Sequence, residues 1–512
     1  MPSTAFQWLG LVGIIWLQVI NGTNTNFPAY SSQLKQLLSI SQFQLNNLAF
    51  ASDAGKLFGF LSGLAAVYFP LWLVLMIGST LGLIGYGVQF LFITNQISSL
   101  SYWHVFFLTV LAGNSICWIN TVCYVITIRN FSSDRQVAVG ITTSYQGLSA
   151  KVYTSIVDVA GHKKRAITFL FLNSVLPLIV GLIATPVVRE IEVIRPKHIS
   201  VGFVVIFVIT IASGIYAVMS SLEFVSSKIT PIGNLIGVSV SLLLPLLVPL
   251  SMKIVESWHK NTEKQRVYNF TLEDGHNERT DNEVKEGEES EEVQDVGVRE
   301  EVGAKVMLRR IDFWLYFFVY LFGATLGLVF LNNLGQIAES RGYSGTSSLV
   351  SLSSSFGFFG RLMPSIVDYF YRDSKCGSAI SRPASMMVFM APTAGAFFLL
   401  LNKTHLALYV STAIIGVCTG AITSIAVSMT TELFGNKNFS VNHNVVVANI
   451  PVGSLLFGYL ASIVYRKGVN EGGKCMGMEC YRTTFIIWGS LCFFGTFLAF
   501  ILHARTRKFY SH

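Results

Sequence analysis

The sequence predicts an all-α integral membrane protein with about 12–14 transmembrane helices, arranged as two six-helix bundles with room for two extra spans between them. Three observations support this fold. The 512-residue chain is 52% hydrophobic and only 12% charged, whereas soluble domains carry roughly 25% charged residues. Apolar stretches long enough to cross a hydrocarbon core of roughly 30 Å recur from end to end. Polar landmarks in the first part of the chain also return in the last part at nearly the same spacing.

Fourteen apolar stretches are candidate spans. They cover residues 6–30, 44–67, 71–94, 103–128, 136–159, 166–187, 199–221, 231–254, 311–334, 346–370, 383–401, 405–431, 440–465 and 482–503. The first has no basic flank before it and no small-residue cleavage pattern after it, so we expect a retained anchor rather than a removable signal peptide.

The first span ends in an unusually polar stretch, 21-NGTNTNFPAYSSQLK-35. Pro28 has no N–H, so the carbonyl of Asn24 loses its helical partner and the helix is prone to bend there. Such a break is tolerated in a membrane only where protein or a water-filled cavity satisfies the freed group. Asn21 and Asn24 are therefore predicted to belong to the inner wall of a bundle, along the path of a substrate.

A long polar segment interrupts the spans once. Its Glu-rich stretch, 286-EGEESEE-292, cannot bury enough apolar surface to fold, and we expect a disordered tether. The predicted organisation is a first bundle at 1–190, two additional helices at 191–255, an acidic cytoplasmic tether at 256–308, a second bundle at 309–505 and a short basic tail at 506–512.

An internal repeat supports the two bundles. Asn21 lies near the end of the first span, and Asn332 lies near the end of the first span after the tether. Basic-Asn-Phe-Ser motifs follow the fourth span of each bundle, at Asn130 and Asn438. The separation is 109 positions in the first bundle and 106 in the second. Weak internal repetition of this kind is typical of transporters.

Charge indicates the orientation only weakly. An even number of spans places both termini on one side, which we expect to be the cytoplasm. Segments on that side hold 21 Lys or Arg, against 11 on the other side, but the excess comes almost entirely from nine in the tether. The net charge of +8 lies at loop ends rather than on a soluble domain, which is the usual topology signal and argues against a nucleic-acid partner. The membrane is expected to be the plasma membrane or an endomembrane.

Several motifs resemble those of the major facilitator superfamily and, within it, the plant nodulin-like group that includes nuclear-fusion-defective-like proteins. The resemblance spans nearly the full chain. It rests on 27-FPAYSSQLK-35, 113-GNSICWINT-121, 129-RNFSSDR-135, 331-LNNLGQIAESRGYS-344, 356-FGFFGRLMPSIVDYFYR-372, 432-ELFGNKNFS-440 and 475-CMGMECYRTTF-485. It implies a major-facilitator-type fold that exposes a central site alternately to the two sides of the membrane.

The same resemblance suggests a latch. Arg361, Asp368 and Arg372 resemble the superfamily's loop motif between the second and third helices of a bundle, where a carboxylate and arginines hold cytoplasmic helix ends together. The corresponding first-bundle segment, 67-VYFPLW-72, lacks these charges. Glu432, at a cytoplasmic span end, is a further gate or latch candidate.

A charged group within a span costs about 2.5–3.5 kcal/mol at the bilayer centre on insertion scales. Each such group is therefore expected to have a structural or functional role. Asp53 and Lys56 lie three residues apart, hence on one helical face. They form either a cavity pair coupled to substrate or proton movement, or a structural pair between helices. Lys151 is either a cavity residue, favouring an anionic substrate such as a carboxylate, or a structural lysine.

Amides and a histidine complete the intramembrane candidates. Asn114 and Asn120 in the fourth span either line the path or bond between helices, and Asn332 and Asn333 are path candidates by the repeat. His443 falls at a span end, where an interfacial histidine is favoured over a pH sensor.

No enzymatic site is predicted. The chain lacks a nucleophile elbow, a Walker loop and a His-Glu-x-x-His pair, so neither a cofactor nor a metal is expected. Cys475 and Cys480 lie in one polar loop and form a disulfide if that loop faces an oxidising compartment.

The predicted function is secondary, non-ATP-driven transport of a small solute, with an organic anion favoured. The alternative is a transporter-like receptor or scaffold that signals through the acidic tether. The expected partners are a small-molecule substrate and the lipid bilayer, and the expected state is a monomer.

Overall fold

This computed structural model describes most of the chain. The described residues are 4–161, 164–191, 199–221, 228–255, 257–258, 300–343, 346–372, 381–468 and 475–510. Most of the predicted acidic tether therefore lies outside the described residues. All regular structure within the described ranges is helical. We call residues 4–191 the N-half and residues 300–510 the C-half.

The N-half forms one run of helices and helical turns. They are α1 (Thr4–Asn21), η1 (Thr23–Asn26), α2 (Phe27–Leu38), α3 (Gln42–Ala54), η2 (Gly55–Phe58), α4 (Gly59–Tyr68), α5 (Leu71–Ile93), α6 (Tyr102–Asn130), η3 (Ser132–Asp134), α7 (Arg135–Gln146), α8 (Ser149–Ala160) and α9 (Arg165–Ala184). The two predicted extra helices follow as α10 (Ile199–Met219) and α12 (Pro231–Leu243), the latter continued by η5 (Leu244–Leu246).

The C-half repeats this helical character. Its elements are α14 (Ala304–Met307), α15 (Ile311–Tyr320), the π-helical turn η7 (Leu321–Thr325), α16 (Leu326–Ser340), α17 (Thr346–Arg372), α18 (Arg382–Leu399), α19 (His405–Phe434), α20 (Phe439–Val447), α21 (Asn449–Lys467), η8 (Met478–Cys480) and α22 (Arg482–Tyr510).

Every predicted span is helical, but the spans differ in character. Ten helical stretches of the described chain are long and apolar enough to cross a membrane. The other four coincide with the predicted spans 44–67, 136–159, 346–370 and 383–401. The first three carry charged side chains within the span, whereas α18 has one charged residue, Arg382, at its start. A helix that faces a polar interior can give up part of its apolar surface, because neighbouring helices shield it from lipid.

The predicted break in the first span is confirmed. α1 ends at Asn21, a 3-10 turn covers Thr23–Asn26, and α2 begins with Pro28 in its first turn. A missing N–H costs nothing at that place, because the first-turn donors of a helix have no intrahelical acceptor. The proline thus starts a second helix at an angle instead of interrupting a continuous one.

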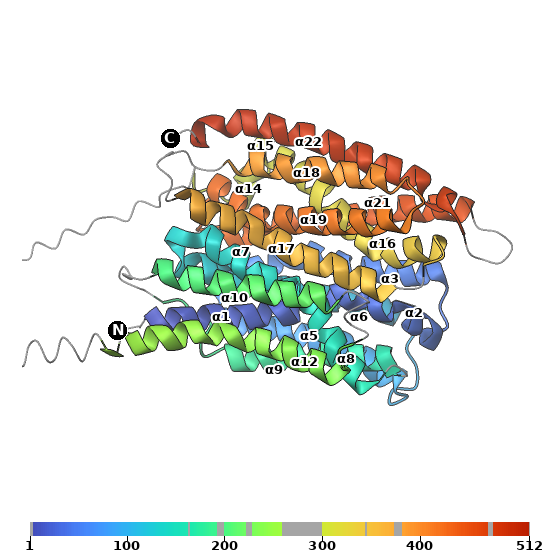
Figure 1. Ribbon diagram of the computed structural model, residues 1–512, viewed down its shortest axis with the longest axis horizontal. Helices are drawn as coiled ribbons and strands as arrows, with labels where there is room; N and C mark the ends of the chain where they lie inside the picture. Colours follow the sequence, from blue (N-terminus) through green and yellow to red (C-terminus); the bar gives the residue numbers. More distant parts are fainter. Residues whose placement is uncertain are drawn as a thin grey trace, which may run out of the picture.

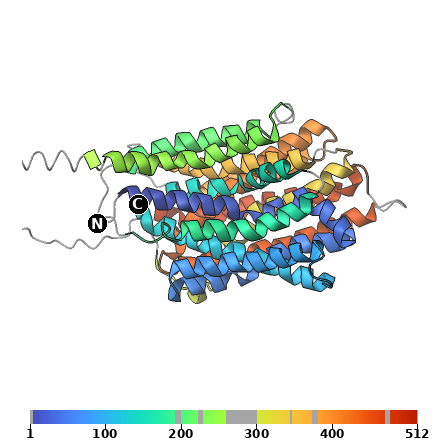
Figure 2. The same ribbon diagram turned by 90° about the horizontal axis from the view of Figure 1, so that it is seen from below.

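The helices run side by side along the long axis of the molecule, with both chain ends at the same end (Figure 1). We call this the termini end. The two extra helices lie along one flank, as the view from below shows (Figure 2). α12 packs on α8 of the N-half and α10 packs on α17 of the C-half, so the extra pair touches both halves. One buried apolar cluster accordingly joins Trp8, Phe203 and Phe358.

Candidate functional site

A cavity of about 90 Å³ lies between the two halves. The N-half contributes η1, η2, α6 and α7 to its wall, and the C-half contributes α15, α16, α17, α19, α20 and α21. The volume has room for several water molecules, since one needs about 10–15 Å³ of such space. Because both halves line it, any movement of one half against the other changes its shape.

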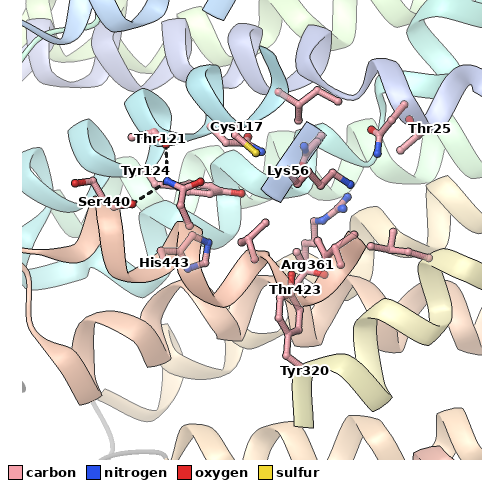
Figure 3. A pocket seen from close by; sticks show the side chains of 18 of the residues that line it. Thr25, Lys56, Cys117, Thr121, Tyr124, Tyr320, Arg361, Thr423, Ser440 and His443 are labelled. Carbon is pink, nitrogen blue, oxygen red and sulfur yellow. Dashed lines mark hydrogen bonds between the residues drawn. The ribbon is translucent and has the colours of Figure 1, made fainter. Parts of the chain in front are cut away.

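Two cationic side chains face this cavity from opposite walls. Figure 3 shows Lys56 of η2 and Arg361 of α17 pointing toward one another. Lys56 is buried and its Nζ lies 2.6 Å from Asp53 Oδ1. Arg361 makes no ion pair with a carboxylate of the described residues, and its Nε is buried without a hydrogen-bond partner. The cavity therefore carries one paired and one uncompensated positive charge.

Aromatic rings form much of the remaining wall. The ring of His443 stacks on Phe439 at 5.1 Å and meets the edge of Tyr124 at 5.5 Å. Its Nδ1 lies 3.2 Å from Thr430 Oγ1. Tyr124 comes from the N-half and His443 from the C-half, so this contact joins the halves across the cavity. The sequence suggested an interfacial histidine, whereas the structure places His443 at the cavity (Figure 3).

The predicted amides divide into two groups. Asn24 and Asn120 line the cavity. Asn21 is buried behind them and donates to Asn120 Oδ1 at 2.9 Å and to the carbonyl of Ile116 at 3.1 Å. Asn114 donates to the carbonyl of Gly55 at 2.9 Å, so it bonds α6 to η2 and is absent from the cavity wall.

A much larger hollow opens at the opposite end from the chain termini. This vestibule has a volume of about 1140 Å³ and is lined by residues of α2, α3, α16 and α21. A smaller hollow of about 70 Å³ shares Asn46 and Asn332 with it, and also includes Asn333 and Ser454. Asn333 donates to the carbonyl of Val329 within its own helix, at 2.8 Å.

A polar bridge separates the vestibule from the cavity. Asp53 Oδ1 accepts from Lys56, and Oδ2 accepts from Asn332 Nδ2 at 3.2 Å and from Ser454 Oγ. Lys56 lines the cavity, whereas Asn332 and Ser454 line the hollow beside the vestibule. We call these four residues the Asp53 bridge. It joins the N-half to the C-half through one buried carboxylate.

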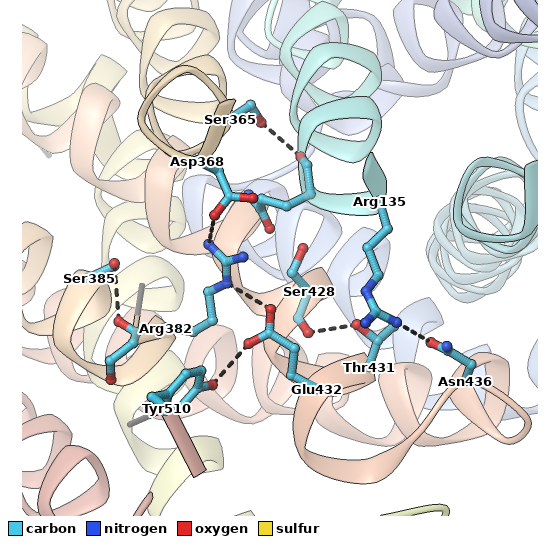
Figure 4. A network of polar contacts seen from close by, with 12 residues as sticks. Arg135, Ser365, Asp368, Arg382, Ser385, Ser428, Thr431, Glu432, Asn436 and Tyr510 are labelled. Atoms are coloured by element: carbon cyan, nitrogen blue, oxygen red, sulfur yellow. Dashed lines mark hydrogen bonds and ion pairs between the residues drawn. The ribbon is translucent and has the colours of Figure 1, made fainter. Parts of the chain in front are cut away.

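A charged cluster at the termini end lies entirely within the C-half (Figure 4). Arg382 of α18 pairs with Asp368 at 2.8 Å and with Glu432 at 2.9 Å, and the hydroxyl of Tyr510 donates to Glu432 at 3.0 Å. Asp368 and Glu432 thus lie where the latch was expected. Arg382 is the first residue of α18, and the sequence motif that contains Arg361 and Asp368 does not extend to it.

Arg361 is placed differently from the expectation. It precedes Asp368 by seven residues, about two helical turns or roughly 10 Å along α17, and it lines the cavity instead of joining the cluster. Arg372 is the last residue of α17, and its side chain lies outside the described residues.

Besides Arg135, which donates to Asn436 at 3.3 Å, neutral contacts close the termini end between the halves. Ser365 Oγ donates to the carbonyl of Gln136 at 2.9 Å, and Ser440 Oγ donates to the carbonyl of Gly63 at 3.0 Å. A Cβ at Gly63 would overlap Ser440. The helices therefore approach so closely here that only hydrogen fits as a side chain.

Lys151 does not line the cavity. Its Nζ donates to the carbonyl of Ser220 at 2.9 Å, just beyond the last residue of α10. A positive charge is favourable at a helix C-terminus, where carbonyl groups lack intrahelical partners. Lys151 thus joins α8 to an extra helix, and the structural alternative fits this geometry.

Cys475 and Cys480 are joined by a disulfide in the loop before α22. The backbone N–H of Gly477 in this loop donates to the carbonyl of Ser340 at the end of α16. The disulfide loop thus lies at the vestibule end. Among the described residues, no group of three or more His, Cys, Asp or Glu side chains could hold a metal ion.

Comparisons with known proteins agree with this architecture. A family model described as Nodulin-like matches residues 7–254, and one described as NFD4, C-terminal domain matches residues 295–512. Protein NUCLEAR FUSION DEFECTIVE 4 of Arabidopsis thaliana is 38% identical over 531 residues, covering 98% of this chain and 89% of that protein. Probable transporter MCH1 of Gibberella zeae is 26% identical over 211 residues, covering 34% of this chain and 37% of that protein.

Solved structures show the same fold. A double tryptophan mutant of XylE matches with a TM-score of 0.58 at 10% identity, covering 98% of this chain and 96% of that chain. XylE, a proton:xylose symporter of the major facilitator superfamily, bound to 6-bromo-6-deoxy-D-glucose, matches with a TM-score of 0.55 at 11% identity, covering 96% and 95%. With nearly its whole length matched to this plant relative, the chain belongs to the nodulin-like family, and it has the fold of the XylE transporter structures.

Proposed function

We propose that this multi-pass membrane protein is a secondary transporter of a small organic anion. The observation that carries the proposal is Arg361, a largely buried cation in the central cavity with no carboxylate partner among the described residues. An ionised group removed from water is costly unless it is paired. A bound anion would supply the missing charge.

The chemistry of the wall favours a carboxylate or a similar planar anion. The guanidinium group presents a fork of N–H donors that matches a carboxylate in two parallel hydrogen bonds. Asp53 already neutralises Lys56, so an anion beside Arg361 leaves the cavity close to neutral. Tyr124 and Tyr320 provide apolar faces on either side, and the small volume favours a substrate of few atoms.

Alternating access follows from closure at both ends of the cavity. The Asp53 bridge closes it toward the vestibule, and the contacts of Ser365 and Ser440 close it toward the termini end. We propose that the two bundles, 1–190 and 309–505, rock about the cavity so that one closure opens while the other holds.

We also propose a proton as the coupling ion, with Asp53 as its carrier. Protonation would remove the charge that holds Lys56 and would weaken the contacts with Asn332 and Ser454. XylE is described as a proton:xylose symporter, so the shared fold supports this type of coupling. The test measures uptake of a small carboxylate into proteoliposomes with and without an imposed pH gradient. If a proton is the coupling ion, the gradient should increase this uptake.

The disulfide supports an orientation. Disulfides persist in oxidising compartments, and the Cys475–Cys480 pair lies at the vestibule end. We propose that the vestibule faces the cell exterior or an organelle lumen, with the termini and the tether in the cytoplasm. No observation on the described residues favours the alternative of a receptor or scaffold.

A thermal-shift screen of the purified protein tests the substrate class. Ligand at one hundred times its dissociation constant stabilises a folded protein by about 2.7 kcal/mol. We expect small carboxylates, but not neutral sugars of similar size, to raise the melting temperature of the wild type. Arg361→Ala should lose this response. Arg341→Ala is the matched control, because that arginine donates to the carbonyls of Leu400 and Asn402 at the vestibule end.

Two results would overturn the proposal. One is stabilisation of the wild type by neutral solutes and by no anion. The other is an unchanged response to anions in Arg361→Ala.

A further inference from the structure

The short segment that leads from the tether into the C-half docks on a loop at the termini end. We call residues 300–303 the strap. The carboxylate of Glu301 accepts the backbone N–H groups of Asn436 at 2.8 Å and Lys437 at 3.1 Å. The N–H of Val302 donates to the carbonyl of Phe434 at 3.0 Å. The strap thus holds the connection between α19 and α20 at three points.

The loop is shaped to receive this carboxylate. Gly435 has a φ of +90°, a conformation that side chains disfavour, and a Cβ there would collide with Glu301. The two N–H groups that follow this turn donate to the two oxygens of one carboxylate, an arrangement that binds anions. Bonds from backbone N–H to a carboxylate are charge-assisted and stronger than neutral ones.

Neighbouring contacts anchor the strap and the first helical turn after it. Asn442 Nδ2 of α20 donates to the carbonyl of Val302 at 2.7 Å. Val302 and Met307 are buried in an apolar cluster with Phe434. Glu301 itself is exposed, so solvent and salt reach its carboxylate while the rest of the strap is held by packing.

The loop between α19 and α20 also contacts the N-half. Asn436 Oδ1 accepts from Arg135 Nη1 of α7 at 3.3 Å (Figure 4). α20 begins three residues later, and its Ser440 and Asn444 bond to Gly63 and Thr121 of the N-half. The strap therefore orders the C-half element that meets the N-half at this end.

We infer that Glu301 is a positioning residue of the gate at the termini end, supplied by the tether. It holds the loop from Phe434 to Asn438 in the conformation that engages Arg135 and directs α20 against the N-half. Pulling the strap off this loop favours opening of the cavity toward the termini end. The strap thereby acts on the gate through Glu301.

A native cysteine provides the readout without a known substrate. Cys117 lines the central cavity and is a free, buried thiol. Its labelling by a membrane-impermeant maleimide, measured by mass spectrometry of the peptide, reports the opening of the cavity. Sealed vesicles of both orientations, sorted by an epitope tag at the C-terminus, distinguish the termini end from the vestibule end. A Cys117→Ser variant confirms which peptide carries the signal.

Glu301→Ala is compared with Glu300→Ala. Glu300 is the adjacent acid and pairs with Arg310 at 2.6 Å, so the control removes the same charge without touching the loop. We expect Glu301→Ala to raise Cys117 labelling from the termini end several-fold, with no rise from the vestibule end. Glu300→Ala should label like the wild type, and Glu301→Gln, which keeps one acceptor, should lie between.

Folding is checked by size-exclusion chromatography and the melting temperature. If Glu301→Ala does not fold, Cys117 labelling is compared between Glu301→Gln and Glu300→Gln instead, and a rise from the termini end is expected only in Glu301→Gln. Wild-type labelling in the folded Glu301 variants would overturn the inference, and so would an equal rise from both ends, which indicates general loosening. The anion proposal is untouched by either result, because no substrate enters the assay.

Discussion

The cavity between the halves is closed toward the vestibule and toward the termini end by different kinds of contact. At the vestibule end, the buried carboxylate of Asp53 accepts hydrogen bonds from Lys56, Asn332 and Ser454. At the termini end, neutral hydroxyls reach backbone carbonyls across helices in close contact. One closure depends on the charge of a single group, whereas the other depends on fit. A change of protonation can therefore release the first while the second stays closed.

The largest effect is expected from Asp53→Ala. It leaves the buried Lys56 ammonium without a carboxylate, and breaking a buried pair from one side costs about 3–5 kcal/mol. The free energy of unfolding in detergent should fall by this amount. The double variant Asp53→Ala/Lys56→Met should recover most of the loss, because it removes the unpaired charge. An unchanged single variant would show that the bridge is not a stabilising pair.

Glu432→Gln should have the next largest effect. It replaces one of the two carboxylates on Arg382, and hydrogen bonds to charged groups contribute about 1.5–3 kcal/mol. All partners lie in the C-half, so we expect lower stability but unchanged Cys117 labelling from either side. A change in labelling would mean that this cluster also controls the gate.

Gly63→Ala tests the role of fit at the termini end. The added Cβ overlaps Ser440, and overpacking costs about 1–3 kcal/mol in the closed conformation. We expect increased Cys117 labelling from the termini end. Gly458→Ala is the matched control, since a Cβ there meets no atom within 4 Å. Equal labelling of the two variants would contradict closure by close packing.

Lys151→Met should have the smallest effect. The buried ammonium at the end of α10 contributes at most about 2 kcal/mol, and the lysine is absent from the cavity wall. The melting temperature should fall slightly, and the response to anions should match the wild type. Loss of that response would restore Lys151 as a substrate residue.

Much of the fold could be predicted from local pattern. The length of apolar stretches identifies spans, and Pro28 identifies the break after α1, because a missing N–H acts on its own helix. The pairing of Asp53 with Lys56 also follows from spacing on one helix. The repeat around Asn21 and Asn332 predicts amides along a substrate path, which stays a prediction; in the structure both side chains are hydrogen-bonded, to Asn120 and to Asp53.

The roles of Arg361, Arg382 and His443 could not be predicted in this way. Arg361 and Asp368 share a motif, yet the distance along α17 separates them into a cavity and a cluster. Arg382 joins that cluster from the start of the next helix, which a motif confined to one segment does not include. His443 lines the cavity because α20 crosses toward Tyr124 of the other half.

The sequence by itself determined that the chain lies in a membrane, which stretches of it are helical, and which residues pair along one helix. These properties depend on hydropathy and on neighbours within a few residues. Only the tertiary structure decided which polar side chains meet across the two halves, because that depends on the rotation of each helix and on contacts between residues hundreds of positions apart. The uncompensated charge of Arg361 and the docking of Glu301 on the loop after α19 belong to this second kind.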